Sequence, residues 1–288
     1  MIGRLRVYYQ LTKPGVTYGN VLTVIAGYFL AARGQIDGWL FVSTVIGMTL
    51  VIAAACALNN YLDQDIDKLM TRTKARPSVT GQVPGSHMVM YAIGLMALGM
   101  TLLIVGTNWL VVTLAALGFV TYVWLYGVLS KRRSIHGTLV GSISGAFPIA
   151  AGYGAVSGQA DAGLVLVFMI MFFWQFPEFY SIAIYRRKEY AAAHIPVMPV
   201  VKGVRSTIIQ IGLYTILYVL STLSLTFIGL TGYTYFVVMA LMGGYWLWLA
   251  YQGLSAKDAD AWARRMFKFS MATILLLCLM LCVGPLLP

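Results

Sequence analysis

Residues 38–77 read GWLFVSTVIGMTLVIAAACALNNYLDQDIDKLMTRTKARP. The first 21 of these residues, 38–58, include no charged side chain. A helix of about 20 apolar residues is long enough to cross the hydrocarbon core of a bilayer. Residues 59–67 then carry three aspartates, and residues 68–77 carry four basic side chains. The stretch therefore predicts a membrane-spanning helix that ends in an acidic segment followed by a basic one.

The composition of the whole chain agrees with a membrane protein. Of its 288 residues, 60% are hydrophobic and only 10% are charged, whereas soluble domains carry about 25% charged residues. A water-soluble enzyme is thereby excluded. We predict an all-α integral membrane protein, one domain over residues 1–288, with nine transmembrane helices in one bundle. The apolar runs are 16–32, 38–58, 88–106, 108–129, 137–156, 162–184, 207–229, 231–251 and 268–285.

The basic residues predict an orientation. With the N-terminus in the cytoplasm, 19 of the 20 Lys and Arg residues fall on the inner side, and only Arg33 lies outside. Such a bias sets the topology of membrane proteins. The net charge of +11 is therefore a topology signal, and we expect no nucleic-acid partner. The C-terminus is expected outside, and the protein in a bacterial cytoplasmic membrane. The long connections, where we expect the active site, then face the cytoplasm: 59–87, 130–136, 185–206 and 252–267.

Four of the nine acidic residues are expected to have structural rather than catalytic roles. Asp37 and Asp161 are expected to be ordinary residues of outer loops. Asp258 and Asp260 are expected in a polar inner loop, where they cap or solubilise the start of a helix.

The first acidic segment favours a metal site. If the helix continues, Asn59, Asp63 and Asp67 lie four residues apart on one face. Two carboxylates about 6 Å apart repel each other by roughly 2–3 kcal/mol at an effective dielectric near 20. A divalent cation offsets this repulsion, and Mg²⁺ prefers oxygen ligands shared with substrate phosphates. The alternative is neutralisation by the basic residues that follow: Lys68, Arg72, Lys74 and Arg76.

A second acidic segment ends the sixth apolar run. Glu178 lies inside this run, and Tyr185 and Glu189 follow at spacings that share its face if the helix continues. An ionisable residue inside a membrane span is a functional hypothesis by default. The alternative is a carboxyl group hydrogen-bonded to a neighbouring helix. Both acidic segments precede a basic stretch with Pro and Gly, which suggests two related halves facing a common centre.

Acids on two facing helices, surrounded by Arg and Lys, suit a phosphorylated ligand. Cations connect carboxylates to phosphate oxygens, and the apolar bundle accommodates a long hydrocarbon tail. We therefore predict a lipid diphosphate whose head group lies at the inner surface.

The sequence resembles the UbiA-type intramembrane prenyltransferases. Asn59, Asp63 and Asp67, followed by RTKARP at 72–77, look like the first signature of that family. The second half is similar to one branch of it, the protohaem IX farnesyltransferases. The matching stretches are 11–15, 59–67, 72–74, 131–134, 141–146 with Pro148, 174–175 with Pro177, and 195–203.

The resemblance implies an activity and assigns residues to it. Members of this branch ionise farnesyl diphosphate with Mg²⁺ and transfer the farnesyl group to a vinyl group of haem B with addition of water, which gives haem O. The implied catalytic residues are Asp63, Asp67, Glu189 and Tyr185, the last from the second motif. The implied metal ligands are Asn59, Asp63, Asp67 and Glu189. Assembly partners such as haem A synthase or a terminal oxidase are implied too. The implied substrate-binding residues are Asn59, Asn60, Arg72, Lys74, Arg76, Lys131, Arg132, Glu178 and Lys202.

Two residues depart from this pattern. Members of the branch usually have His where Glu178 stands, and often Asp where Glu189 stands. Glu189 keeps the carboxylate, whereas Glu178 replaces an imidazole with an acid. The substrate-binding role implied for Glu178, including contact with the acceptor, therefore rests on a carboxyl group where the branch has an imidazole.

Two other functions stay open on the sequence. The first is a UbiA-type enzyme that prenylates an aromatic acid or a quinone precursor, since it shares the first motif. The second is a secondary transporter with paired repeats and intramembrane carboxylates. Against the transporter, the acids gather at the inner rim rather than at the bilayer midplane.

Overall fold

The computed structural model describes residues 2–288, with side chains from residue 5 onward. Over this range it is helical, and nine helices are long and apolar enough to cross a membrane, which confirms the predicted count. The spans are α2 (Pro14–Ala32), α3 (Gly38–Leu62), α5 (Gly85–Gly106), α6 (Trp109–Val120) continued by the π-helix η1 (Thr121–Ser130), α7 (Gly137–Ser157), α8 (Ala162–Tyr185), α11 (Gly203–Phe227), α12 (Tyr233–Gln252) with η2 (Gly253–Ser255), and α13 (Ala259–Val283) with η3 (Gly284–Leu286).

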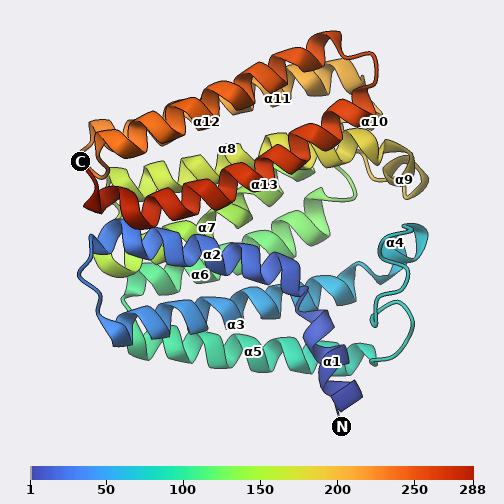
Figure 1. The fold of residues 1–288 in the computed structure, drawn as a ribbon. Coiled ribbons are helices and arrows are strands. Elements are labelled where there is room, and N and C mark those ends of the chain that lie inside the picture. Colours follow the sequence, from blue (N-terminus) through green and yellow to red (C-terminus); the bar gives the residue numbers. More distant parts are fainter. Residues whose placement is uncertain (1) are drawn as a thin grey trace.

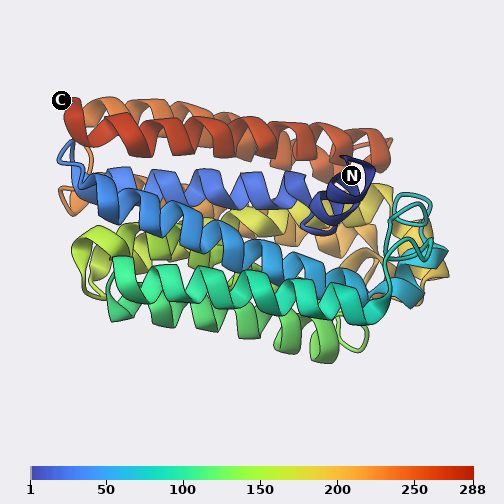
Figure 2. The ribbon, with the colours of Figure 1, turned by 90° about the horizontal axis from the view of Figure 1, so that it is seen from below.

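Four short helices lie outside the spans: α1 (Ile2–Leu11), α4 (Gln64–Leu69), α9 (Arg187–Ala192) and α10 (Met198–Val201). The spans run side by side along one direction (Figure 1), and α4, α9 and α10 all lie at one end of the bundle, which we call the tip end. The C-terminus lies at the opposite end, and the view from below (Figure 2) shows the same separation. The two acidic segments therefore lie at the same end of the molecule.

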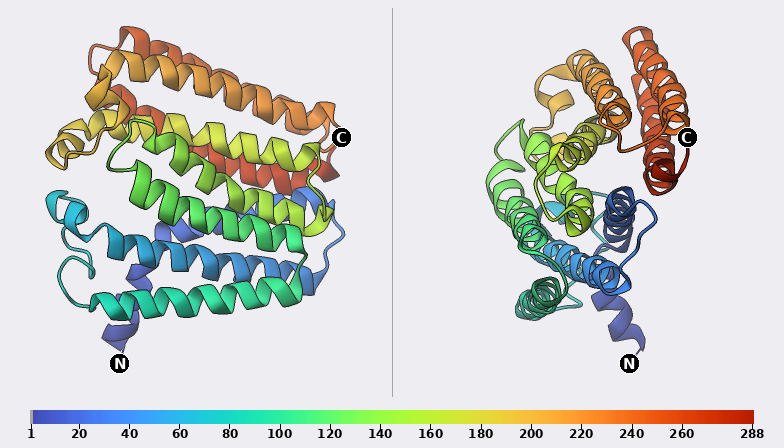
Figure 3. Two further views of the ribbon diagram at one scale, coloured as in Figure 1. Left: turned by 180° about the vertical axis from the view of Figure 1, so that it is seen from behind. Right: turned by 90° about the vertical axis from the view of Figure 1, so that its left-hand side faces the viewer.

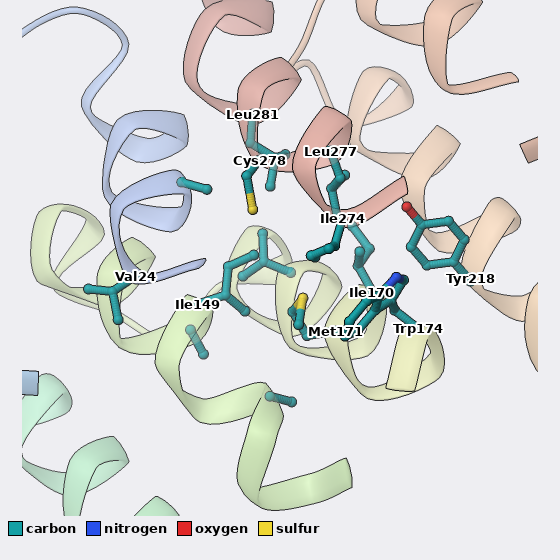
Figure 4. Packing of buried hydrophobic residues seen from close by; sticks show 14 of the residues in the cluster. Val24, Ile149, Ile170, Met171, Trp174, Tyr218, Ile274, Leu277, Cys278 and Leu281 are labelled. Carbon is teal, nitrogen blue, oxygen red and sulfur yellow. The ribbon is translucent and has the colours of Figure 1, made fainter. Parts of the chain in front are cut away.

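The core is packed most closely between α2 and α7. A Cβ atom on Gly27 would lie 2.2 Å from the carbonyl oxygen of Ile149, and one on Gly152 would lie 2.0 Å from that of Val24. Glycine at both positions therefore allows the two backbones to touch. Side chains from α2, α7, α8, α11 and α13 interdigitate around this contact (Figure 4), and Cys278 is buried among them as a small apolar group.

Helix capping corrects one of our expectations. Asp37 and Asp161, expected to be ordinary loop residues, accept hydrogen bonds from the backbone N–H groups of Leu40 (3.0 Å) and Leu164 (2.9 Å). Each thereby satisfies a free donor in the first turn of a transmembrane helix.

The last span also begins earlier than predicted. The expected loop 252–267 is wrong, because α13 starts at Ala259, directly after Asp258, which accepts from the N–H of Ala261 at 3.0 Å. Arg264 and Arg265 lower the hydropathy of this region, yet Trp262 and Met266 beside them are buried. Four-residue spacing of the buried side chains, rather than overall hydropathy, determines this helix start.

Candidate active site

The first acidic segment keeps its predicted face although the helix does not continue unchanged. α3 ends at Leu62, and α4 begins at Gln64, with Asp63 between them. The N–H of Asp63 still donates to Asn59 O (3.0 Å), and that of Asp67 donates to Asp63 O (2.9 Å). These bonds keep the four-residue spacing on which the shared face was predicted, and Asn59, Asp63 and Asp67 are all buried.

All three aspartates of this segment are paired with cations. Lys131 Nζ lies 2.5 Å from Asp63 Oδ2, and Arg76 Nη1 lies 2.6 Å from Asp67 Oδ2. Arg132 donates two hydrogen bonds to the exposed Asp65, at 2.5 and 2.7 Å. This guanidinium holds the pKa of the Asp65 carboxyl below its usual value. Of the four basic residues in the alternative weighed above, only Arg76 pairs with an aspartate among the described residues. The other cations, Lys131 and Arg132, come from a distant connection.

Lys13 belongs to this network, although sequence reasoning gave it no role. Its ammonium donates to Asn59 Oδ1, and the Tyr122 hydroxyl lies 3.4 Å from the same oxygen. Burial lowers the pKa of Lys13 to about 8. Its backbone is left-handed, with φ 49°, where the chain turns into α2 at Pro14. The only sequence signal was its place in the matching stretch 11–15.

Asn60 connects separate segments within the protein. Its Nδ2 donates to Leu11 O (2.8 Å), and its Oδ1 accepts from Arg76 Nη1 (3.3 Å). Both ends of the amide are thus occupied by the chain itself, so Asn60 holds Arg76 in place beside Asp67.

The second acidic segment is interrupted as well. α8 ends at Tyr185, Arg186 separates the helices, and α9 carries Glu189, so the expected single helical face through Glu189 is wrong. Glu189 Oε1 accepts from Arg186 Nη1 at 3.1 Å. The guanidinium carbons of Arg264 and Arg186 lie 4.6 and 5.6 Å from the centre of the Tyr185 ring, so this ring packs against α13.

The two segments meet at the tip end. Ile66 and Met70, in and just after α4, form a buried cluster with Ala193 and Ile195, which follow α9. Figure 3 (left) shows α4 and α9 next to each other. A hollow of about 310 Å³ lies along this contact, with Asp65, Arg132 and His194 in its lining.

Charges of the first segment also act on the second. Burial raises the pKa of the Tyr190 hydroxyl, next to Glu189, and the positive charges of Arg72, Lys131 and Arg186 partly oppose this. Arg72 and Lys131 are therefore close enough to influence a side chain on α9. The two segments thus meet at one end of the bundle, and a shared site for their acidic side chains stays a prediction.

Three buried polar atoms of the two acidic segments have no hydrogen-bond partner among the described residues: Asn59 Nδ2, Asp63 Oδ1 and Glu189 Oε2. A buried polar atom left unpaired costs about 1–3 kcal/mol, so a ligand that bonds to these atoms would recover that free energy. Nowhere in residues 5–288 do three His, Cys, Asp or Glu side chains converge on one point. The donor set therefore fits Mg²⁺ held by one or two carboxylates and completed by phosphate oxygens.

The remaining predicted site residues differ in their surroundings. Lys74 and Arg72 are exposed on the segment after α4, and Lys202 is exposed at the end of α10. None of these three forms an ion pair within the described part of the chain. Glu178 is half-buried within α8.

Comparison with known proteins identifies the family. The family model described as the UbiA prenyltransferase family matches residues 20–281. The chain belongs to this family. It is 46% identical over 279 residues to "Protoheme IX farnesyltransferase" of Yersinia pseudotuberculosis, with 97% of this chain and 95% of the relative covered. It is 47% identical to the protein of the same name from Chromohalobacter salexigens, with the same coverage of both chains.

Solved structures share the fold. A structure described as digeranylgeranylglyceryl phosphate synthase matches with a TM-score of 0.83 at 16% identity, over 98% of this chain and 99% of the other. A UbiA homologue from Archaeoglobus fulgidus bound to GPP and Mg²⁺ matches with a TM-score of 0.71 at 14% identity, over 96% of this chain and 99% of the other. The protein is thus an integral membrane prenyltransferase with the UbiA fold.

Proposed function

We propose that this UbiA-family protein transfers the farnesyl group of farnesyl diphosphate to a vinyl group of haem B, with addition of water, and so forms haem O. The relatives named protoheme IX farnesyltransferase, at 46–47% identity over 97% of the chain, support this acceptor over an aromatic acid or a quinone precursor. The basic bias supports a site on the cytoplasmic side of the inner membrane. The product then passes to haem A synthase or terminal oxidase assembly in the same membrane.

One observation carries the proposal. The acidic segments meet at the tip end, and Asp63 Oδ1 and Glu189 Oε2 are buried without a hydrogen-bond partner, on carboxylates that pair with Lys131 and Arg186. Asn59, Asp63, Asp67 and Glu189 are the residues that would hold Mg²⁺. When bound, the ion supplies Lewis-acid stabilisation of the departing diphosphate.

Side chains of the protein bind the diphosphate and exclude water from the reacting carbon. Lys131 and Arg76 pair with aspartates, and we propose that they turn toward the diphosphate when it binds, together with Arg72, Lys74 and Arg132. The hydrogen bond to Asn60 keeps the Arg76 guanidinium next to Asp67, from where it turns toward the diphosphate. The apolar spans bind the farnesyl chain and keep bulk water from the allylic cation until the acceptor attacks.

A direct test uses the full chain purified in detergent with farnesyl diphosphate, haem B and Mg²⁺. We expect farnesylated, hydrated haem in the mass spectrum of the extracted porphyrins. Formation of a prenylated aromatic acid instead, with haem B unchanged, would assign the protein to the other branch of the family. Membranes with and without the protein give the matching comparison in cells.

Metal removal tests the ion. EDTA should stop turnover, and Mg²⁺ added in excess should restore it. In the proposed function, Mg²⁺ is the divalent cation that connects the carboxylates of the two segments to the diphosphate. Continued turnover in EDTA would remove the metal from the mechanism.

A further inference from the structure

Glu178 differs from every other acidic side chain of the protein. The chain has nine Asp and Glu residues, and within residues 5–288 eight of them cap a helix or bind a cation. Glu178 has no hydrogen bond or ion pair there, although it lies inside the membrane-spanning α8. A carboxyl group in this position is costly to insert and points to a functional role.

The helical register shows which way Glu178 faces. It follows Trp174 by four residues and Gln175 by three, and such residues share one face of a helix. Trp174 Nε1 donates to Ser270 O of α13 (3.1 Å), and Gln175 Nε2 donates to Ser142 O of α7 (2.9 Å). Glu178 therefore lies on the face of α8 that is turned toward α7 and α13.

Its depth separates it from the diphosphate site. Glu178 lies seven residues before the end of α8, which is about 10 Å along the helix axis. The paired aspartates and basic residues lie at the tip end. Under the proposed function, a group at this depth would meet the prenyl chain and the acceptor rather than the phosphates.

A second unsatisfied group accompanies Glu178. Ser142 Oγ is buried and has no hydrogen-bond partner among the described residues, although the carbonyl of the same residue accepts from Gln175. Ser142 thus lies next to Gln175 across the contact of α7 and α8, and Glu178 lies one helical turn from Gln175 on α8. Ordered waters inside proteins occur where two to four polar groups are otherwise unsatisfied.

We propose that Glu178 accepts the proton of the water that adds to the vinyl group, a role that rests on the proposed function. The C–O bond of farnesyl diphosphate breaks, and its electron pair leaves on the diphosphate. The farnesyl carbon bonds to the terminal vinyl carbon, which leaves the positive charge on the carbon next to the porphyrin ring. Water, held by Ser142, bonds to that carbon through oxygen and gives its proton to the Glu178 carboxylate.

The other acids are unsuited to this step. Asp63, Asp65 and Asp67 lie within 2.6 Å of a cationic nitrogen, and a bound cation makes a carboxylate a weaker base. Glu189 also accepts from a guanidinium. Among the described acids Glu178 is the carboxylate in the apolar interior that is free to take a proton.

The decisive variant is Glu178→Gln, assayed as the full chain in detergent with farnesyl diphosphate, haem B and Mg²⁺. Diphosphate release should persist, whereas haem O formation should fall by about 100-fold or more, the usual contribution of a general base. The cation should instead lose a proton from carbon, which gives a farnesylated haem one water lighter. Glu178→Asp should restore hydrated product, and Ser142→Ala should raise the dehydrated share.

The matched control is Asp37→Asn, an acid at the far end of the bundle that caps α3; we expect its product ratio to equal that of the wild type. Haem O formation by Glu178→Gln at the wild-type rate would overturn the proposal. So would weakened haem B binding in a spectral titration with an unchanged product ratio, since Glu178 would then bind the acceptor. If Glu178→Gln does not fold, an unchanged product ratio in Ser142→Ala overturns it. Wild-type protein that makes no farnesylated haem refutes the proposed function, and the role of Glu178 with it.

Discussion

The two acidic segments that meet at the tip end hold their carboxylates differently. In the first, Asp63 and Asp67 are buried, and each lies within 2.6 Å of a cation that another part of the chain supplies. In the second, Glu189 is paired only with Arg186, three residues away, at 3.1 Å, and its Oε2 is buried without a partner. The buried carboxylates of the first segment are thus each neutralised by a cation of the chain, whereas the carboxylate of the second segment is neutralised only in part.

This difference suggests a division of roles. A buried carboxylate that is paired with a cation holds that cation in a fixed position. In the proposed function, the substrate phosphates then replace the carboxylate as the partner of the same cation. A carboxylate with a free oxygen is available to complete a metal site. We therefore expect substitutions of the buried Asp63 and Asp67 to lower turnover strongly and substitution of Glu189 to change metal dependence.

The largest effect is expected for Asp63→Asn. It removes the charge opposite Lys131 and one of the unpaired buried oxygens, so kcat/KM should fall by about 10²–10³, the range for loss of one preorganised electrostatic group. Asp65→Asn is the matched control, because its side chain is 66% exposed and its ion pair is worth less than about 1 kcal/mol. Haem O assays and thermal melting in detergent measure both variants. Near-normal turnover of Asp63→Asn would contradict the metal role.

Glu189→Gln should have a smaller effect of a different kind. The amide keeps the hydrogen bond from Arg186 but loses the charge on Oε2, so the Mg²⁺ concentration that gives half-maximal rate should rise about 10- to 100-fold. A Mg²⁺ titration of the rate at saturating farnesyl diphosphate measures this. An unchanged titration would show that the second segment contributes no ligand and that the first suffices.

Arg72→Ala addresses the contact between the segments. Arg72 is exposed and forms no ion pair among the described residues, yet its charge acts on Tyr190 of α9. We expect the KM for farnesyl diphosphate to rise about tenfold, as for loss of one charged hydrogen bond, with little change in kcat. Lys202→Ala, on α10, should raise KM less, by about twofold to fivefold. Equal effects of both variants would indicate general charge attraction rather than a defined contact.

Hydropathy and spacing predicted much of this arrangement from the sequence. The nine spans follow from apolar runs, and the shared face of Asn59, Asp63 and Asp67 follows from four-residue spacing. The helix breaks at Asp63 and Arg186 have no glycine or proline to mark them. They depend on contact between α4 and the segment after α9, which is a tertiary effect.

Ion pairing was harder to predict than helix positions. Lys131 and Arg132 follow Asp63 by almost 70 residues, and they reach it only because η1 and α3 end side by side at the tip end. The bond from Lys13 to Asn59 likewise joins segments that sequence distance alone does not connect. Sequence therefore identified the residue types of the site, and tertiary packing selected the pairs.

The smallest effect is expected for Tyr185→Phe. This variant tests whether the second segment contacts the diphosphate as directly as the first. The Tyr185 ring lies against the guanidinium of Arg264, at 4.6 Å, and its hydroxyl has no hydrogen bond among the described residues. A phenylalanine ring supports the same cation–π contact, so kcat/KM and thermal stability should stay within about twofold of the wild type. Tyr185→Leu, which removes the ring, should lower the melting temperature, since an exposed cation–π contact contributes about 0.5–1 kcal/mol. A tenfold or larger loss of turnover in Tyr185→Phe would show instead that the hydroxyl contacts substrate, and the second segment would then bind the diphosphate as directly as the first.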